Sequence, residues 1–306
     1  MPGRPPERAR ALGRALLGHS YAASKQVALL RMARRHDAPT VVFSMGKTGS
    51  TAIARAVQDA TGRPVFQVFR LEPTRLREAE QRYRARRAVL QRSAEGRGPD
   101  VDRPAVAFPG AYHLWESEFL VRHPPTAAAP WRIVTTVREP VAQAVSAFFH
   151  AERQSGAADA GDPGDPAVLA DLTDRFVSEA WVRAPLRWFE REFRPAVGID
   201  PLVHPFDPAS GAAVIETPAA RVLLLRQESF AVAPAALAAF LGTAAPVTVP
   251  RRNDGTAAPN AATYRRFLAE ARLPTALLDE AYESPYAEHF YGKDEIARFR
   301  HRWSGE

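Results

Sequence analysis

The stretch Thr40–Val57, TVVFSMGKTGSTAIARAV, decides the fold that the sequence predicts. Its β-branched and aromatic start, Thr40–Phe43, is typical of a buried strand, and a helical pattern rich in Ala, Ile and Val begins near Ser50. Between them, glycines let backbone N–H groups approach an anion, hydroxyl side chains add donors, and the helix start adds unpaired amides. We therefore expect a phosphate or sulfate site, with Lys47 as its mobile positive charge; an ordinary strand–helix turn is the alternative. The predicted members of the site are Gly46, Lys47, Thr48, Gly49, Ser50 and Thr51.

The length of this loop narrows the kind of phosphate site. A Walker A loop has a glycine five residues before the glycine that precedes its lysine. Here that position is Val41, inside the predicted strand, so the loop is too short for a standard ATPase or GTPase. Lys-x-Gly-[Ser/Thr]-[Ser/Thr] directly after a strand instead resembles the 5′-phosphosulfate loop of P-loop sulfotransferases, which use 3′-phosphoadenosine 5′-phosphosulfate (PAPS).

A second stretch contains the partner motif that this resemblance requires. Trp131–Val137, WRIVTTV, predicts a strand, Arg138 follows it, and Pro140 is placed to start a helix. Ser146 lies eight residues after Arg138, two turns into that helix. P-loop sulfotransferases hold the 3′-phosphate of PAPS with an Arg that ends a strand and a Ser eight residues later. The resemblance thus implies that Arg138 and Ser146 bind the 3′-phosphate, with Arg offering a bidentate fork. A surface cap and a small packing residue are the alternative roles.

The candidate for the catalytic base is His113. The apolar run Ala105–Glu116 predicts a strand that ends near this residue, and open α/β sheets place their active sites at such strand ends. Imidazole has a pKa suited to general-base catalysis near neutral pH. Several sulfotransferase families carry their acceptor-activating His shortly before the 3′-phosphate strand, which implies that role for His113. Glu72 and Glu116 are alternative bases, because other families of the superfamily use a carboxylate.

The rest of the chain predicts further strands and helices. Pro64–Phe69 and Arg221–Glu228 read as strands, and Leu202–Phe206 with Ala213–Ile215 as a hairpin. Thr74–Gln91 predicts a helix whose arginines form either a solvated face or a docking surface for a polyanionic acceptor.

One longer helical stretch contains many aromatic residues. Asp171–Phe193 predicts a helix that breaks near Pro185. Its aromatic residues are spaced as core residues are, so we assign them to the core rather than to an acceptor pocket.

Composition limits the classes of function. The chain has 306 residues, a net charge of +7 and no cysteine, which excludes disulfides, thiolate metal sites and a Cys nucleophile. Its basicity favours anionic ligands, but no nucleic-acid-binding module is visible. We expect a basic, partly helical extension over residues 1–36 and a single domain over 37–306. The longest apolar run of the extension, Val27–Leu30, is too short for a signal or a membrane span, so we expect a cytoplasmic protein with at most peripheral membrane contact.

The last third of the chain adds two weaker signals. Arg251-Arg252-Asn253 lies in a polar turn, and the resemblance implies that Arg251 and Asn253 belong to a loop that closes over the nucleotide. Tyr282–Trp303 resembles the end of a bacterial sulfotransferase-like family named for capsular polysaccharide synthesis. Tyr286, His289-Phe290-Tyr291, Glu295-Ile296 and Trp303 carry that likeness.

Together these patterns predict an α/β protein: a P-loop-type three-layer sandwich with a mainly parallel central sheet flanked by helices. The resemblance implies transfer of a sulfuryl group from PAPS to an acceptor hydroxyl, with a glycan of the capsule or cell surface as one candidate acceptor. The product would be 3′-phosphoadenosine 5′-phosphate (PAP). We expect no metal, since Lys47 supplies the positive charge. An atypical P-loop small-molecule or sugar kinase and a non-catalytic capsule-assembly protein are the alternatives.

Overall fold

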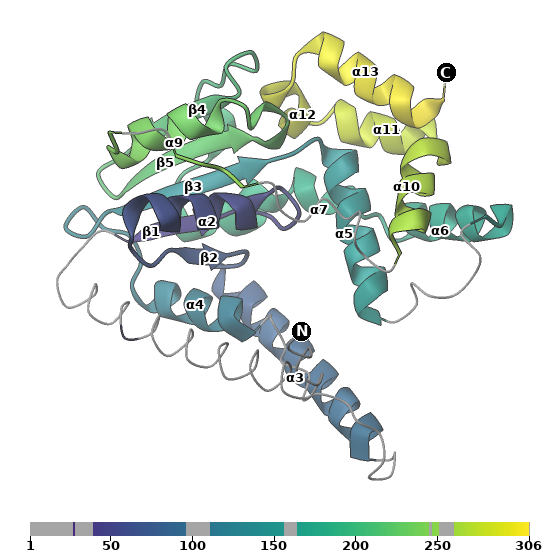
Figure 1. The fold of residues 1–306 in the computed structure, drawn as a ribbon, viewed down its shortest axis with the longest axis horizontal. Helices are drawn as coiled ribbons and strands as arrows, with labels where there is room; N and C mark the ends of the chain where they lie inside the picture. The colour runs from purple at the N-terminus through teal and green to yellow at the C-terminus, as the bar shows by residue number, and fades with distance from the viewer. Residues whose placement is uncertain are drawn as a thin grey trace, which may run out of the picture.

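The protein is built around a five-stranded sheet in the order β2-β1-β3-β5-β4 (Figure 1). The computed structural model describes residue 27 and residues 39–95, 111–155, 164–244, 247–250 and 260–305. The strands are β1 (Thr40–Phe43), β2 (Phe66–Val68), β3 (Trp131–Val137), β4 (Ala212–Glu216) and β5 (Ala220–Arg226). The first, second, third and fifth strands pair in parallel, and β4 is antiparallel to β5. The predicted α/β class with a mainly parallel sheet is confirmed.

Helices cover the sheet and form a separate group beside it. They are α2 (Ser50–Thr61), α3 (Pro73–Glu95), α4 (Ala111–Arg122), α5 (Pro140–Ser155), α6 (Pro166–Ser178), α7 (Arg183–Leu186), α8 (Arg194–Val197), α9 (Ala233–Leu241), α10 (Ala261–Glu270), α11 (Thr275–Tyr282), α12 (Pro285–Phe290) and α13 (Lys293–Ser304). Shorter turns are the π-helical η2 (Phe189–Phe193) and the 3-10 turns η3 (Pro201–Val203) and η4 (Gln227–Ser229).

The central strands are apolar on both faces, as expected for parallel strands covered by helices on two sides. In β1, Val41 and Phe43 point into one core, which α4, η2 and α12 complete. Val42 points the opposite way, into a core shared with α2 and α9. The sheet is therefore the middle of three layers. A third core, around the buried Phe148, joins α5 to the C-terminal helices α10, α11 and α13.

Two predicted elements are wrong. Residues 111–116 of the expected strand Ala105–Glu116 belong to helix α4, while 105–110 lie outside the described residues. Glu116 and Leu120, one helical turn apart, are both buried, so burial recurs here with the period of a helix. The expected hairpin of Leu202–Phe206 with Ala213–Ile215 does not form. Asp200 accepts a hydrogen bond from Leu202 N and begins the 3-10 turn η3, and β4 pairs with β5 instead.

Candidate functional site

The loop between β1 and α2 lies where the parallel strands β1 and β3 both end. Its backbone takes the left-handed conformation at Lys47 (φ 70°) and at Gly49 (φ 82°). A side chain at Gly49 would also collide with Phe230, since a Cβ there would lie 2.6 Å from a ring carbon. Glycine is therefore required at this position, and the loop turns sharply into helix α2.

Three consecutive carbonyl groups of the loop are held by side chains of the protein. The carbonyl of Met45 accepts from the hydroxyl of Thr48 at 2.9 Å, and that of Gly46 accepts from Nε2 of Gln143 at 2.8 Å. The carbonyl of Lys47 accepts from Nη1 of Arg138 at 3.0 Å. Carbonyls that are held by the protein in this way are compatible with an anion-binding loop, in which the backbone N–H groups face the anion.

Thr48 has a structural role within this loop. Its side chain is fully buried, and its single hydroxyl hydrogen is donated to Met45. The hydroxyl also lies 2.6 Å from that of Thr136 on β3, which must then be the donor of this second bond. Thr48 thus ties the loop to the central strand.

The start of α2 supplies the positive end of a helix dipole. No acidic residue lies in its first turn, so nothing in the helix offsets that partial charge. The hydroxyl groups of Ser50 and Thr51 both lie near Nε2 of Gln67 on β2, at 3.4 and 3.1 Å. The predicted site residues 46–51 therefore form one continuous stretch, which runs from the loop into the first turn of α2.

Arg138 and Gln143 reach this loop from the end of β3 and from helix α5. The contact of Arg138 with Lys47 joins two motifs that are 91 residues apart in the sequence. On α5, Gln143 contacts the loop, and Ser146 lies one turn farther along the same helical face. The structure thus brings Arg138 to the loop, and it places Ser146 on the helix that follows, one turn beyond a residue that contacts the loop.

Three positively charged side chains, those of Lys47, Arg138 and Arg153, lie close enough to affect one another at this loop. Burial lowers the pKa of Lys47, and the positive charges of Arg153 and Arg138 lower it further. Arg138 and Arg153 donate to neutral oxygen atoms, the carbonyl of Lys47 and the side-chain amide of Asn260. Three neighbouring cations, two of them bonded to neutral oxygen atoms, favour a bound anion, because like charges that converge are otherwise destabilising. The residues present therefore fit an anionic, phosphate-bearing ligand.

His113 lies on α4 beside the adjacent strand. Its Nδ1 is 2.6 Å from the carbonyl oxygen of Gln67, which can only accept, so Nδ1 carries the proton and Nε2 of the neutral ring is the basic nitrogen. The ring packs edge-on against Phe69 with centroids 4.7 Å apart. Gln67 contacts His113 through its carbonyl and the start of α2 through its side chain, so this one residue connects the candidate base to the anion-binding loop.

The two alternative bases are engaged in holding backbone groups. The carboxylate of Glu72 accepts from the amides of Thr74 and Arg75 at the start of α3. Burial raises the pKa of Glu72 but these amides lower it, with a net decrease, so its carboxylate is a weaker base than usual. Glu116 is buried and accepts from the amide of Gln67 at 2.7 Å.

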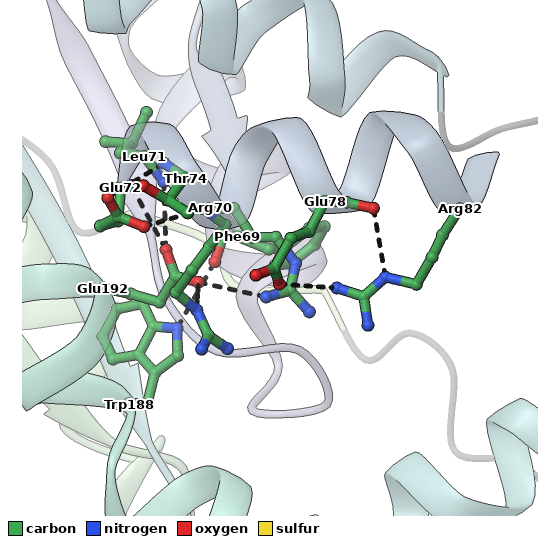
Figure 2. A network of polar contacts seen from close by, with 10 residues as sticks. Phe69, Arg70, Leu71, Glu72, Thr74, Glu78, Arg82, Trp188 and Glu192 are labelled. Carbon is green, nitrogen blue, oxygen red and sulfur yellow. Dashed lines mark hydrogen bonds and ion pairs between the residues drawn. The ribbon is translucent and has the colours of Figure 1, made fainter. Parts of the chain in front are cut away.

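A buried carboxylate holds the turn that follows β2 (Figure 2). Glu192, in η2, accepts hydrogen bonds from the side chains of Arg70 and Arg75 and from the amides of Leu71 and Glu72. The turn begins at Phe69, whose carbonyl accepts from the Trp188 indole at 3.4 Å and whose ring contacts His113. The position of the candidate base therefore depends on this network.

Sequence reasoning missed Gln67 and Gln143. Both were visible as single polar residues inside apolar runs, PVFQVF in a strand and PVAQAV in a helix. A buried amide needs hydrogen-bond partners, so such an interruption signals a specific contact. Arg251 and Asn253, the predicted nucleotide-closing loop, lie outside the described residues, as does the 1–36 extension except Val27.

The part of the chain that the structure describes contains no group of three or more His, Asp or Glu residues arranged to hold a metal ion. Within the same residues, no helix is both long and apolar enough to cross a membrane. Comparison with protein-family models, with curated proteins and with solved structures finds no match for this chain.

Proposed function

We propose that this protein is a PAPS-dependent sulfotransferase that transfers a sulfuryl group to an acceptor hydroxyl. The observation that carries the proposal is the 3.0 Å hydrogen bond from Arg138 to the carbonyl of Lys47. It supports a single site made from the two motifs that resemble the 5′-phosphosulfate loop and the 3′-phosphate site of P-loop sulfotransferases. A ligand with phosphate groups on both the 5′ and the 3′ oxygen of its ribose accounts for both motifs at once.

Each part of the site has a distinct task in this proposal. The loop amides and the start of α2 bind the 5′-phosphosulfate, and Lys47 stabilises the negative charge that builds on the leaving phosphate oxygen. Arg138 and Ser146 bind the 3′-phosphate and fix the orientation of the donor. Bound PAPS supplies the sulfuryl group, whose bond to the 5′-phosphate breaks as the acceptor oxygen bonds to sulfur. Nε2 of His113 takes the proton of the acceptor hydroxyl.

The lowered pKa of Lys47 suits this role. Burial and two neighbouring arginines make its ammonium group unfavourable when the loop binds no anion. A bound phosphosulfate relieves that cost, and the relief is greatest when the leaving oxygen carries its full charge. Positioning and electrostatics would then supply most of the rate enhancement, as in phosphoryl transfer.

The acceptor is a hydroxyl-bearing molecule, and a carbohydrate of the capsule or cell surface is our candidate class. The likeness of the C-terminal stretch to a capsule-synthesis family is the support for this choice. Transfer of labelled sulfuryl from PAPS to a panel of saccharides, compared with lipid and small-metabolite acceptors, tests it directly. A Lys47→Ala variant should lose all transfer.

Calorimetric titration with PAP and with ADP separates this proposal from its main rival. We expect PAP to bind more tightly than ADP, without a requirement for Mg²⁺. Equal affinities, or binding that depends on Mg²⁺, would favour a P-loop kinase and overturn the sulfotransferase proposal. If Lys47→Ala leaves the biological output of the protein unchanged, a non-catalytic role in assembly gains support instead.

A further inference from the structure

The C-terminal part of the chain reaches into the donor site through a buried tyrosine. The hydroxyl of Tyr286, on α12, accepts from the amide of Arg138 at 3.2 Å and donates to the carbonyl of the same residue at 2.9 Å. The backbone amide and carbonyl of Arg138 are therefore both hydrogen-bonded to one side chain. Arg138 directly follows β3, and it is the residue whose guanidinium contacts the anion-binding loop.

Two more tyrosines of the same segment hold the next residue, Glu139. The hydroxyl of Tyr282 donates to its carboxylate at 2.6 Å, and that carboxylate also accepts the first-turn amides of α5. The amide of Glu139 donates to Glu228 at 2.8 Å, and Glu228 in turn accepts from the hydroxyl of Tyr291 at 3.1 Å. Figure 1 shows the C-terminal helices beside the start of α5, where these contacts meet.

This arrangement fixes the backbone at the point where a strand changes into a helix. The amide and carbonyl of a residue just past a strand end have lost their sheet neighbours and need other partners when buried. Tyr286 is only 1% exposed, so water does not compete for its hydroxyl. A catalytic or binding side chain works only if its backbone is held to within a fraction of an ångström.

We propose that Tyr286 is a positioning residue for Arg138: its hydroxyl fixes the backbone from which the guanidinium reaches the 3′-phosphate, and the C-terminal segment 282–295 is part of the donor site. This inference rests on the proposed function, since the 3′-phosphate is its ligand. It also gives a role to the C-terminal stretch, whose Tyr286, Tyr291 and Glu295 lie in this network. Glu295 forms a bidentate ion pair with Arg226 at the end of β5, with bonds of 2.6 and 2.9 Å.

The variant Tyr286→Phe removes only the hydroxyl. The ring packs against Phe290 and Phe189, with centroids 5.1 and 6.2 Å away, and phenylalanine keeps those contacts. Tyr291→Phe is the matched control, since it makes the same chemical change in the same buried segment but touches Glu228 instead of Arg138. Any loss that comes from a missing buried hydroxyl in general should therefore occur in both variants.

The readout is the ratio of affinities for PAP and for AMP, which lacks the 3′-phosphate, measured by calorimetry. We expect Tyr286→Phe to lower PAP affinity about tenfold and AMP affinity by a clearly smaller factor, because the charged contact with the 3′-phosphate is weakened directly and the 5′ loop only through the bond of Arg138 to Lys47. Tyr291→Phe should change the ratio by less than about twofold, because its hydroxyl reaches Glu139 only through Glu228 and does not contact Arg138. In an Arg138→Ala background, Tyr286→Phe should have no further effect on PAP, since the two residues act as one unit.

An unchanged ratio in Tyr286→Phe, an equal loss of PAP and AMP affinity, or an equal shift in Tyr291→Phe would each overturn the inference. A wild-type protein that binds PAP and AMP alike would instead overturn the proposed function. Hydrogen exchange at the Arg138 amide distinguishes the two failures, since it needs no ligand. Exchange that is faster in Tyr286→Phe than in Tyr291→Phe supports positioning by the hydroxyl, and equal exchange refutes it.

Discussion

Replacing Glu192 with alanine should destabilise the protein by removing the group that holds the turn after β2. The side chain of Glu192 is 1% exposed, and its carboxylate accepts from Arg75 Nε at 2.5 Å and from Arg70 Nη1 at 3.1 Å. It also accepts from the amides of Leu71 and Glu72 at 3.3 and 3.4 Å (Figure 2). Alanine leaves these donors without their acceptor and leaves a small cavity.

The magnitude follows from how exposed the donors are. Breaking a fully buried ion pair destabilises by about 3–5 kcal/mol. Here the side chains of Arg70 and Arg75 are 36% and 32% exposed, so water can solvate them after the substitution and part of that cost is not felt. The Leu71 amide is buried and cannot be solvated by water in the same way, and an unsatisfied buried amide costs about 1–3 kcal/mol. We expect a total loss of about 2–4 kcal/mol. For a chain of 306 residues that corresponds to a decrease in Tm of roughly 3–6 °C.

Urea unfolding followed by circular dichroism, with calorimetry for Tm, measures this change. Glu280→Ala is the control, because Glu280 forms a short but exposed ion pair with Arg183, at 2.6 Å with side chains 39% and 60% exposed. Such surface pairs contribute about 0–1 kcal/mol. If Glu192→Ala loses no more stability than Glu280→Ala, the assignment of Glu192 as the anchor of this turn is wrong.

Three further predictions concern the loop. The lowered pKa of Lys47 means that the folded state disfavours its charged form, so the free energy of unfolding should rise as pH increases from that lowered pKa towards 10.5. Lys47→Met should abolish this rise and should also abolish PAP binding. Urea unfolding across pH 7–10 measures the rise. If the free energy of unfolding changes with pH by the same slope in both proteins, this prediction is wrong. Thr48→Val should cost about 1–3 kcal/mol, because the hydroxyl of Thr136 loses its buried partner; a loss under about 0.5 kcal/mol in urea unfolding would refute the structural role. Arg153→Gln should weaken PAP binding about fivefold at low salt and less at high salt, as calorimetry at two ionic strengths can measure. Arg183→Gln, which removes an arginine paired with Glu280, is its control, and equal effects of the two would exclude a local role.

How much of the site could be predicted from the sequence depends on how far apart in the chain the two partners of each contact lie. Trp131–Val137 was predicted with its observed bounds, because six of its seven residues are apolar or β-branched and Arg-Glu-Pro follows at once. The meeting of Lys47 and Arg138 also follows from topology, since neighbouring parallel strands end at one edge. The contact of Tyr286 with Arg138 spans 148 residues and joins a helix to a strand end through one hydroxyl, for which no local pattern exists.

The predicted strand at His113 was wrong for a different reason. The run Ala105–Glu116 mixes apolar residues so densely that a strand period and a helix period fit equally well. The structure resolves the ambiguity through Trp115 and Phe119, one helical turn apart, which both pack against the core below the sheet. His113 itself lies against strand β2, where its Nδ1 contacts the carbonyl of Gln67, and its role as the base stays a prediction.

Arg138 joins the two stretches that we propose to bind phosphate. A guanidinium has five N–H donors in a rigid plane. One of them, on Nη1, is used to hold the carbonyl of Lys47, which leaves the others for a phosphate. In the proposed function, the same side chain would hold the 5′-phosphosulfate loop and present charge to a 3′-phosphate, while the hydroxyl of Tyr286 bonds to its backbone. A lysine would keep the charge but could not do both tasks, because its ammonium is a compact point charge without a planar fork. The proposed function thus predicts that arginine at this position couples binding of the two phosphate groups of one ligand, which separate anion sites would not require.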